Sequence, residues 1–478
     1  MGKIIGNPKL EAQRQQLVQA REQGTWATLK TFAKFSGPGW LQSATTLGGG
    51  SLASALYLGV LGGVGFMWLQ PLAMIFGIVM LAAISYVTLS VKERPMDEIN
   101  ARISPILGYG WALCSMLACF VFAMPQFALG VAGITQNLAQ MPTSEVGIGL
   151  EALITVCFYG LAMFMVCMYA LGGKGLKFFE RIIKLSVAAI VICFFGVVAS
   201  LTFSGKIDWS AVMAGFIPNF SVLSEPSSDF MEYIAKLTPD GAKFWSEMIV
   251  SQQRDVVISA AAMAVGINMT FLFPYSMLKK GWNKDFRELA IFDLATGLFI
   301  PFLLATSCIV IASASQFHAT PAQGLAESQI VGGKLVSSGA KPAENLVAGY
   351  IDLLDKRISF DIGAQKFAAM APAQKDAARN ALSRAERDMA AMLVKRYASN
   401  LSETLAPLVG EDIARYVFGF GVIGMAINAM LMNMLICGLC FSEILGKRGA
   451  AKWQITGSAL IALSAIASVF FKGAKMWL

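Results

Sequence analysis

The chain has 478 residues, of which 56% are hydrophobic and only 14% are charged, and its mean hydropathy is +0.61. A soluble domain carries roughly 25% charged residues. The apolar residues are gathered into blocks of about 20, the length at which a helix spans a bilayer, so we expect a membrane protein. The formal net charge is +8, and the basic residues lie where membrane topology requires them. No nucleic-acid partner is therefore expected.

The apolar blocks predict nine membrane spans in chain order. They are expected at residues 37–57, 63–90, 107–138, 147–171, 181–203, 256–278, 289–315, 413–444 and 454–472. Basic residues such as Lys92, Lys177 and Lys280 follow the even-numbered spans. The positive-inside rule then places these connections and the N-terminus in the cytoplasm. The predicted location is the plasma or inner membrane, with the lipid bilayer as a partner.

The spans and connections predict an organisation in six parts. These are a cytoplasmic N-terminal segment (1–36), a first transmembrane repeat (37–204), an outer loop (205–254), helices six and seven (255–316), an outer helical insertion (317–411), and helices eight and nine (412–478). Within the insertion, Ala373–Ser399 is rich in good helix formers and charges. We expect it to form a solvent-exposed helical cap.

Two spans contain residues that break helices. The first span contains three consecutive glycines, Gly48, Gly49 and Gly50, each costing roughly 1 kcal/mol relative to alanine within a helix. The sixth contains Gly266, followed by Pro274, which removes a backbone donor. Irregular backbone persists in a membrane only where protein or a water-filled cavity satisfies it. Breaks five spans apart therefore predict two inverted repeats with a midplane site.

The segment Gly37–Met80 resembles the opening of Nramp-type divalent-metal transporters. The stretches Ala264–Tyr275 and Ile291–Ala295 are similar to that family's sixth helix and to the start of its seventh. The resemblance implies an all-α polytopic membrane protein with the leucine-transporter-type inverted-repeat fold. It also implies broken helices one and six and secondary transport by alternating access.

The metal ligands of the family are replaced in this sequence. Its Asp-Pro-Gly-Asn motif is matched by Gly48–Ser51, and its Met-Pro-His motif by Phe273–Tyr275. The chain has a single histidine, His318. A dehydrated transition metal prefers carboxylate, thioether or imidazole ligands. We therefore predict no metal-binding residue and no cofactor, although Met269 offers a thioether.

An opened glycine run leaves amide N–H groups at a positive helix end, which attracts anions. The leading prediction is therefore a transporter for a small anionic or zwitterionic solute. In the predicted site Tyr275 supplies a hydroxyl and Phe273 an apolar wall. The full set of candidate residues is Thr46, Gly48, Gly49, Gly50, Ser51, Asn268, Thr270, Phe273, Tyr275 and Asn428.

Three alternatives remain open from the sequence. In the first, the cargo is a divalent cation of the Mg, Mn or Fe type, which could keep its water. In the second, the chain is an uncoupled facilitator. In the third, it is a receptor subunit that no longer transports. An enzyme is not expected, because no nucleophile–base pair appears at membrane depth. Asp293 is expected to be a salt-bridged residue at the membrane interface, beside Arg287. The oligomeric state is left open.

Overall fold

The computed structural model describes residues 8–337, 339–447 and 449–471. The first seven residues of the predicted N-terminal segment and the last seven of the final segment lie outside this range. Within the described residues, nine helical segments are long and apolar enough to cross a membrane. The predicted all-α polytopic architecture is confirmed, and the chain is a multi-pass membrane protein.

Thirteen of the described helices belong to the membrane bundle: twelve lie in the nine spans, and α3 directly precedes the first span. They are α3 (Pro38–Thr46), α4 (Gly49–Gly62), α5 (Leu69–Val91), α7 (Pro105–Ala132), α8 (Ile148–Leu171), α9 (Gly173–Phe203), α12 (Pro239–Ala264), α13 (Ile267–Lys280), α14 (Arg287–Leu294), α15 (Ile300–Phe317), α21 (Phe418–Ile444), α22 (Ala451–Ala459) and α23 (Ala462–Phe470). Three of these spans include π-helical turns, η2 (Gly133–Leu138), η7 (Ala295–Phe299) and η8 (Ile413–Val417).

The remaining elements lie in the connections or, for η1 and η6, at the ends of membrane spans. They are α1 (Pro8–Gln23), α2 (Thr25–Phe35), η1 (Gly63–Phe66), α6 (Pro95–Arg102), η3 (Thr143–Glu145), α10 (Trp209–Ala214), η4 (Phe220–Leu223), η5 (Ser228–Phe230), α11 (Met231–Ile234), η6 (Lys284–Phe286), β1 (Gln329–Val331), β2 (Lys334–Val336), α16 (Glu344–Ile362), α17 (Ala364–Ala369), α18 (Pro372–Ala381), α19 (Arg384–Leu393) and α20 (Ala398–Val409). The strands β1 and β2 form an antiparallel hairpin.

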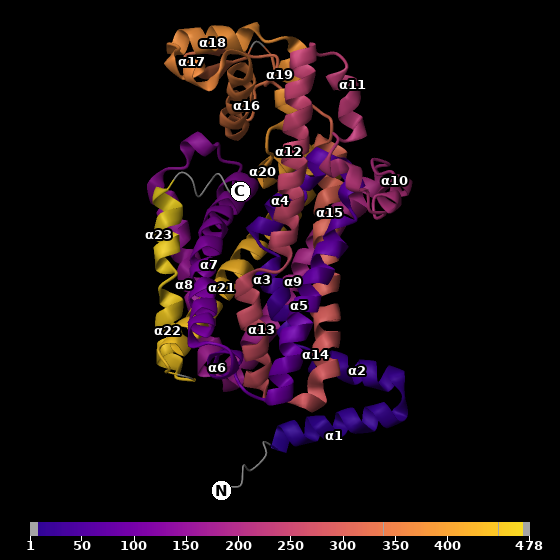
Figure 1. Cartoon of the computed structure of the whole chain (residues 1–478), viewed down its shortest axis with the longest axis vertical. Coiled ribbons are helices and arrows are strands. Elements are labelled where there is room, and N and C mark those ends of the chain that lie inside the picture. The colour runs from indigo at the N-terminus through magenta and orange to yellow at the C-terminus, as the bar shows by residue number, and fades with distance from the viewer. Residues whose placement is uncertain (1–7, 338, 448, 472–478) are drawn as a thin grey trace.

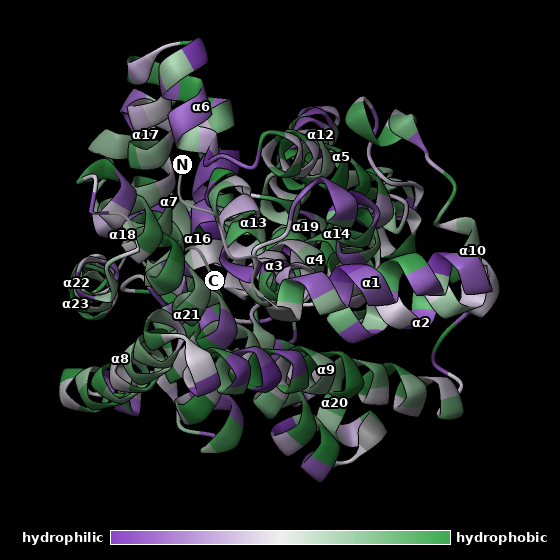
Figure 2. Cartoon of the chain, turned by 90° about the horizontal axis from the view of Figure 1, so that it is seen from below, coloured by the Kyte–Doolittle hydropathy of each residue, from purple (hydrophilic) through white to green (hydrophobic). Residues whose placement is uncertain are grey.

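The packing separates a buried centre from an apolar perimeter. Helix α21 lies in the centre, where 83% of its most apolar window is buried, against 33% for α8 and α9. On α9 the side chains of Leu185, Ile192 and Phe195 are exposed. Figure 2 shows that hydrophobic residues predominate along α8 and α9, whereas α1 is largely hydrophilic. A perimeter of this kind fits contact with lipid, because soluble proteins rarely expose large apolar surfaces.

The basic connections gather on one face, here called the N-terminal side, opposite the insertion side that carries residues 317–411 (Figure 1). Arg14 Nε of α1 lies 2.8 Å from Asp285 Oδ2, in the connection between α13 and α14. Arg94, before α6, pairs with Glu443 at the end of α21. These contacts bring the loops after spans two, six and eight to one face, as the predicted alternation requires.

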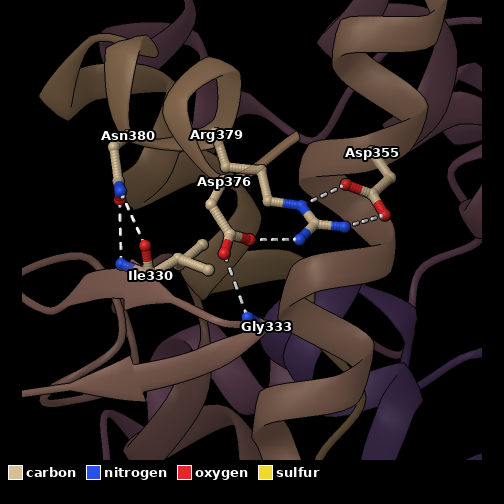
Figure 3. A network of polar contacts seen from close by, with 6 residues as sticks. All are labelled: Ile330, Gly333, Asp355, Asp376, Arg379 and Asn380. Atoms are coloured by element: carbon tan, nitrogen blue, oxygen red, sulfur yellow. Dashed lines mark hydrogen bonds and ion pairs between the residues drawn. The ribbon is translucent and has the colours of Figure 1, made fainter. Parts of the chain in front are cut away.

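The insertion contains several helices and a β-hairpin that pack together, beyond the exposed helical stretch that the sequence predicts. Its Ala373–Ser399 stretch divides into α18 and α19, and Arg379 on α18 makes two hydrogen bonds, 2.6 and 2.7 Å long, to the Asp355 carboxylate on α16. Asp376 accepts from Arg379 at 2.8 Å and from the Gly333 amide of the hairpin at 3.1 Å (Figure 3). The bond to Asp355 is the main reason that the pKa of Arg379 lies above its ordinary value. The cap is therefore a small packed unit.

Candidate functional site

The first break lies between α3 and α4. Helix α3 ends at Thr46, and Gly48 is extended, with φ of −137° and ψ of −172°. A Cβ atom on Gly48 would lie 2.5 Å from Cβ of Ala429 on α21, so only glycine permits this close approach. The Ser51 hydroxyl donates to the Thr46 carbonyl across the break. The glycine run thus breaks the first span, as predicted.

The second break lies between α12 and α13 and faces the first. Val265 and Gly266 are extended there, with ψ of 109° and 162°. The Thr46 hydroxyl lies 3.2 Å from the Ala264 carbonyl oxygen and 3.2 Å from Met269 Sδ. Pro274, which the sequence suggested as part of the break, lies inside α13. Gly266 therefore marks the interruption, and the proline does not.

The start of α4 already has a hydrogen-bond partner. The Gly49 amide donates to Gln126 Oε1 of α7 at 2.8 Å. A Cβ on Gly50 would lie 2.6 Å from Met263 Sδ, so α12 packs closely over the same turn. The Gly49 amide, one of the donors on which the predicted preference for an anion depended, is therefore already paired.

The asparagines meet beside the breaks. Asn268 Nδ2 donates to Asn433 Oδ1 at 2.9 Å, and Asn433 Nδ2 donates to the Ala429 carbonyl at 2.8 Å. Asn268 also lies within hydrogen-bonding reach of the Cys119 thiol. Asn428 is buried, and its Nδ2 has no hydrogen-bond partner among the described residues. The structure brings Asn268 to the breaks and holds it against α21.

Two other predicted residues, Thr270 and Tyr275, lie on α13 after the second break. Trp111 of α7 donates to the Thr270 hydroxyl at 3.0 Å, and its ring packs on Phe271 with centroids 4.7 Å apart. The Phe271 ring in turn stacks on Tyr275, with centroids 4.5 Å apart. Tyr275 lines a cavity on the N-terminal side, and Phe273 is fully buried. Thr270 and Tyr275 thus contact Trp111 and Phe271, and their predicted role in binding the solute stays a prediction.

Cavities lie on both sides of the breaks. One of about 250 Å³ reaches from Tyr397 in the cap to Gly49 at the start of α4. Another of about 420 Å³ lies on the N-terminal side and is lined by Tyr275, Arg94 and Lys279, among others. Neither lining includes Thr46 or Asn268. The residues around the breaks thus form a closed layer between the two cavities.

Gln42 is not among the residues predicted from the sequence. This residue lies on α3, one turn before Thr46, and is fully buried. Its Nε2 donates to the Met269 carbonyl at 3.2 Å, but its Oε1 has no hydrogen-bond partner within the described residues. Buried acceptors without a partner are rare in folded proteins. A polar residue one helical turn from a predicted break is the sequence signal that identifies it.

Asp293 is not the interfacial residue that was expected. It is fully buried and accepts hydrogen bonds from the Gly37 amide at 3.0 Å, the Gly39 amide at 2.7 Å and the Ser36 hydroxyl. Its carboxylate thus caps the start of α3, where orphan amides and the helix dipole favour a negative charge. Asp293 fixes the first half of the broken helix to α14.

Solved structures of low sequence identity match this chain over most of its length. Two solved mutants of the manganese transporter of Eremococcus coleocola share 13% identity with it, cover 92% of this chain and 77% of their own, and superpose with a TM-score of 0.42. The same transporter in complex with an aromatic bis-isothiourea compound gives 12% identity, coverage of 93% and 77%, and a TM-score of 0.40. No curated protein matches the chain.

The sequence model described as natural resistance-associated macrophage protein-like matches residues 39–335, more than half of the chain. Members of this family are membrane transporters with the leucine-transporter-type fold, which agrees with the two facing helix breaks. The chain belongs to the Nramp family.

Proposed function

We propose that this protein is a secondary transporter that carries a divalent metal cation through the layer between its two broken helices. The observation that carries the proposal is the placement of the breaks: Thr46 and Ala264 meet there, between cavities on the two sides. Unwound backbone at membrane depth usually lines a site for an ion or solute. Alternating access then requires each cavity to reach the same layer in turn.

A cation fits the groups at the breaks better than an anion does. The Gly49 amide is occupied by Gln126, whereas Gln42 Oε1 is a buried acceptor without a partner among the described residues. The Met269 sulfur lies 3.2 Å from the Thr46 hydroxyl, and the carbonyl of the same residue accepts from Gln42 Nε2. Oxygen and thioether atoms are metal ligands.

The cation would keep part of its water. No group of three His, Cys, Asp or Glu residues able to hold a metal occurs in the described part of the chain. Without a carboxylate at the breaks, neutral oxygens cannot replace a whole hydration shell, and hard cations such as Mg²⁺ commonly retain several waters. We further propose, from the positive-inside rule, that the N-terminal side faces the cytoplasm.

The test is uptake into proteoliposomes that contain the full-length protein. We expect saturable Mn²⁺ uptake that Gln42→Leu reduces about tenfold in kcat/KM, as the loss of one hydrogen bond to a charged partner predicts. Gln140→Leu, a change at an exposed position on the insertion side, is the matched control and should leave uptake unchanged.

Parallel arms with inorganic phosphate, acetate and glycine test the competing cargoes. Uptake of one of these without Mn²⁺ uptake would overturn the cation proposal and restore the anionic or zwitterionic solute. A pH gradient that leaves Mn²⁺ flux unaltered would identify an uncoupled facilitator. If no solute crosses while the protein stays folded, transport itself is excluded and the receptor alternative is supported.

A further inference from the structure

The cavity on the insertion side holds a buried acidic residue that the breaks do not use. The cavity is lined by residues of α4, α7, α8, α20 and α21, among other elements, and reaches Gly49. Most of its lining is apolar, and Glu151 is the one charged residue among the lining residues, all of which the structure describes. Low-dielectric walls focus the field of such a charge. A cation on its way to Gly49 would meet a negative potential here.

Two polar atoms that have no hydrogen-bond partner among the described residues belong to side chains that line the same cavity. Glu151 lies in the first turn of α8 and is 8% exposed. Thr155 follows four residues later, on the same helix face, and is 3% exposed; its Oγ1 has no hydrogen-bond partner among the described residues. Asn137 of η2 also lines the cavity and is 3% exposed, and its Nδ2 likewise has no hydrogen-bond partner among the described residues. Buried polar atoms are nearly always paired, so two orphans in one cavity indicate a ligand or ordered water.

We propose that Glu151, Thr155 and Asn137 form a binding site for a hydrated divalent cation, here called the vestibule site. The Glu151 carboxylate supplies charge, and the Thr155 hydroxyl and the Asn137 amide contact water molecules of the hydration shell. Mg²⁺ and similar cations are commonly held in this way, by one carboxylate and retained waters. The inference rests on the proposed metal transport and assigns its first binding step on the insertion side.

The cap contributes to the same cavity. Tyr397 and Ser399 line it, and Asn345 lines it from α16. Asn345 Nδ2 lies 3.3 Å from Ser399 Oγ and 3.3 Å from Asn400 Oδ1, so this wall is polar and hydrogen-bonded. Residues of the cap therefore line the cavity that holds the vestibule site and form a polar wall on its insertion side.

The test compares Glu151→Gln with wild type in the full-length protein, using Mn²⁺ as the probe. Binding in detergent is followed by the electron paramagnetic resonance signal of free Mn²⁺, and uptake by proteoliposomes gives KM and kcat. We expect Glu151→Gln to weaken Mn²⁺ binding and to raise KM, each about tenfold, with little change in kcat, because one charged contact is lost on the way to the transport site.

Glu145→Gln is the matched control, because Glu145 is an exposed carboxylate before the same helix and does not line the cavity. It should behave as wild type. Thr155→Val, which keeps the shape of the side chain, should weaken binding by a smaller factor. If Glu151→Gln does not fold, Mn²⁺ binding by Thr155→Val tests the vestibule site in its place, and an affinity equal to that of wild type would overturn the site.

Equal Mn²⁺ affinity and KM in wild type and Glu151→Gln would overturn the vestibule site. Loss in both Glu151→Gln and Glu145→Gln would assign the effect to surface charge and would overturn it too. If wild type transports no Mn²⁺, the proposed cargo is wrong; the binding arm then still decides whether the cavity holds a cation.

Discussion

Asp293 offers a direct test of how the first broken helix is held. Replacing it with alanine leaves the Gly37 and Gly39 amides, at the buried start of α3, without their acceptor. An unsatisfied buried donor costs about 1–3 kcal/mol, so the two amides together predict a loss of about 2–6 kcal/mol in the free energy of unfolding. The Ser36 hydroxyl, which also donates to this carboxylate, adds to the loss.

The expected loss is measurable as a change in thermal stability. An unfolding entropy of about 2.1 cal/mol/K per residue gives roughly 1 kcal/mol/K for a chain of this length. Asp293→Ala should therefore lower Tm in detergent by about 2–6 °C. Asp293→Asn keeps one acceptor oxygen but loses the charge, and we expect an intermediate Tm.

The control is Glu288→Gln, which removes an exposed ion pair with Arg21 that spans 2.9 Å. Exposed pairs contribute about 0–1 kcal/mol, so its Tm should stay close to wild type. An unchanged Tm in Asp293→Ala would refute the conclusion that this carboxylate caps α3. A drop of the same size in Glu288→Gln would show instead that the whole N-terminal side responds to lost charge.

Two further predictions concern the insertion side. His318 lies 3.0 Å from the Val60 carbonyl at the end of α4 and 2.7 Å from the Asp229 carboxylate. His318→Ala should lower the free energy of unfolding by about 1–3 kcal/mol and speed limited proteolysis of the loop that carries Asp229. An unchanged cleavage rate would contradict this prediction. Arg379→Met leaves two partly buried aspartates unpaired and should destabilise the cap by about 3 kcal/mol. Hydrogen exchange should then rise in α16 and α18 but not in α21, whereas uniform exchange in all three would refute an independently packed cap.

The fold was largely predictable because its strongest determinants are local in sequence. Apolar blocks of membrane length and basic connections specify spans and sidedness. The glycines at 48–50 and at 266 mark the breaks, since extended backbone and close helix contacts are cheapest there. Pro274 misled the prediction because its helical φ is compatible with α13 and neighbouring helices can satisfy the freed backbone.

The site was less predictable because its contacts join helices that are far apart in sequence. Gln126 caps Gly49 from another span, and nothing near the glycines signals this. Helix geometry also separates residues that sequence groups together. Thr270 lies about 200° around α13 from Asn268, and Tyr275 lies about 10 Å from Asn268 along the helix axis. Helix geometry therefore places the three residues on different parts of α13.

The hydrogen bonds around the breaks indicate which parts move together during transport. Half-helices α4 and α12 pack together on the insertion side, as do α3 and α13 on the N-terminal side. Asp293 fixes α3 to α14, while Gln126 and Asn433 bind the broken helices to α7 and α21. If α3, α13 and α14 move as a unit during transport, we expect opening toward the N-terminal side to separate them from α7 and α21. That step would break the Asn268–Asn433 bond and leave the bond between Gly49 and Gln126 in place.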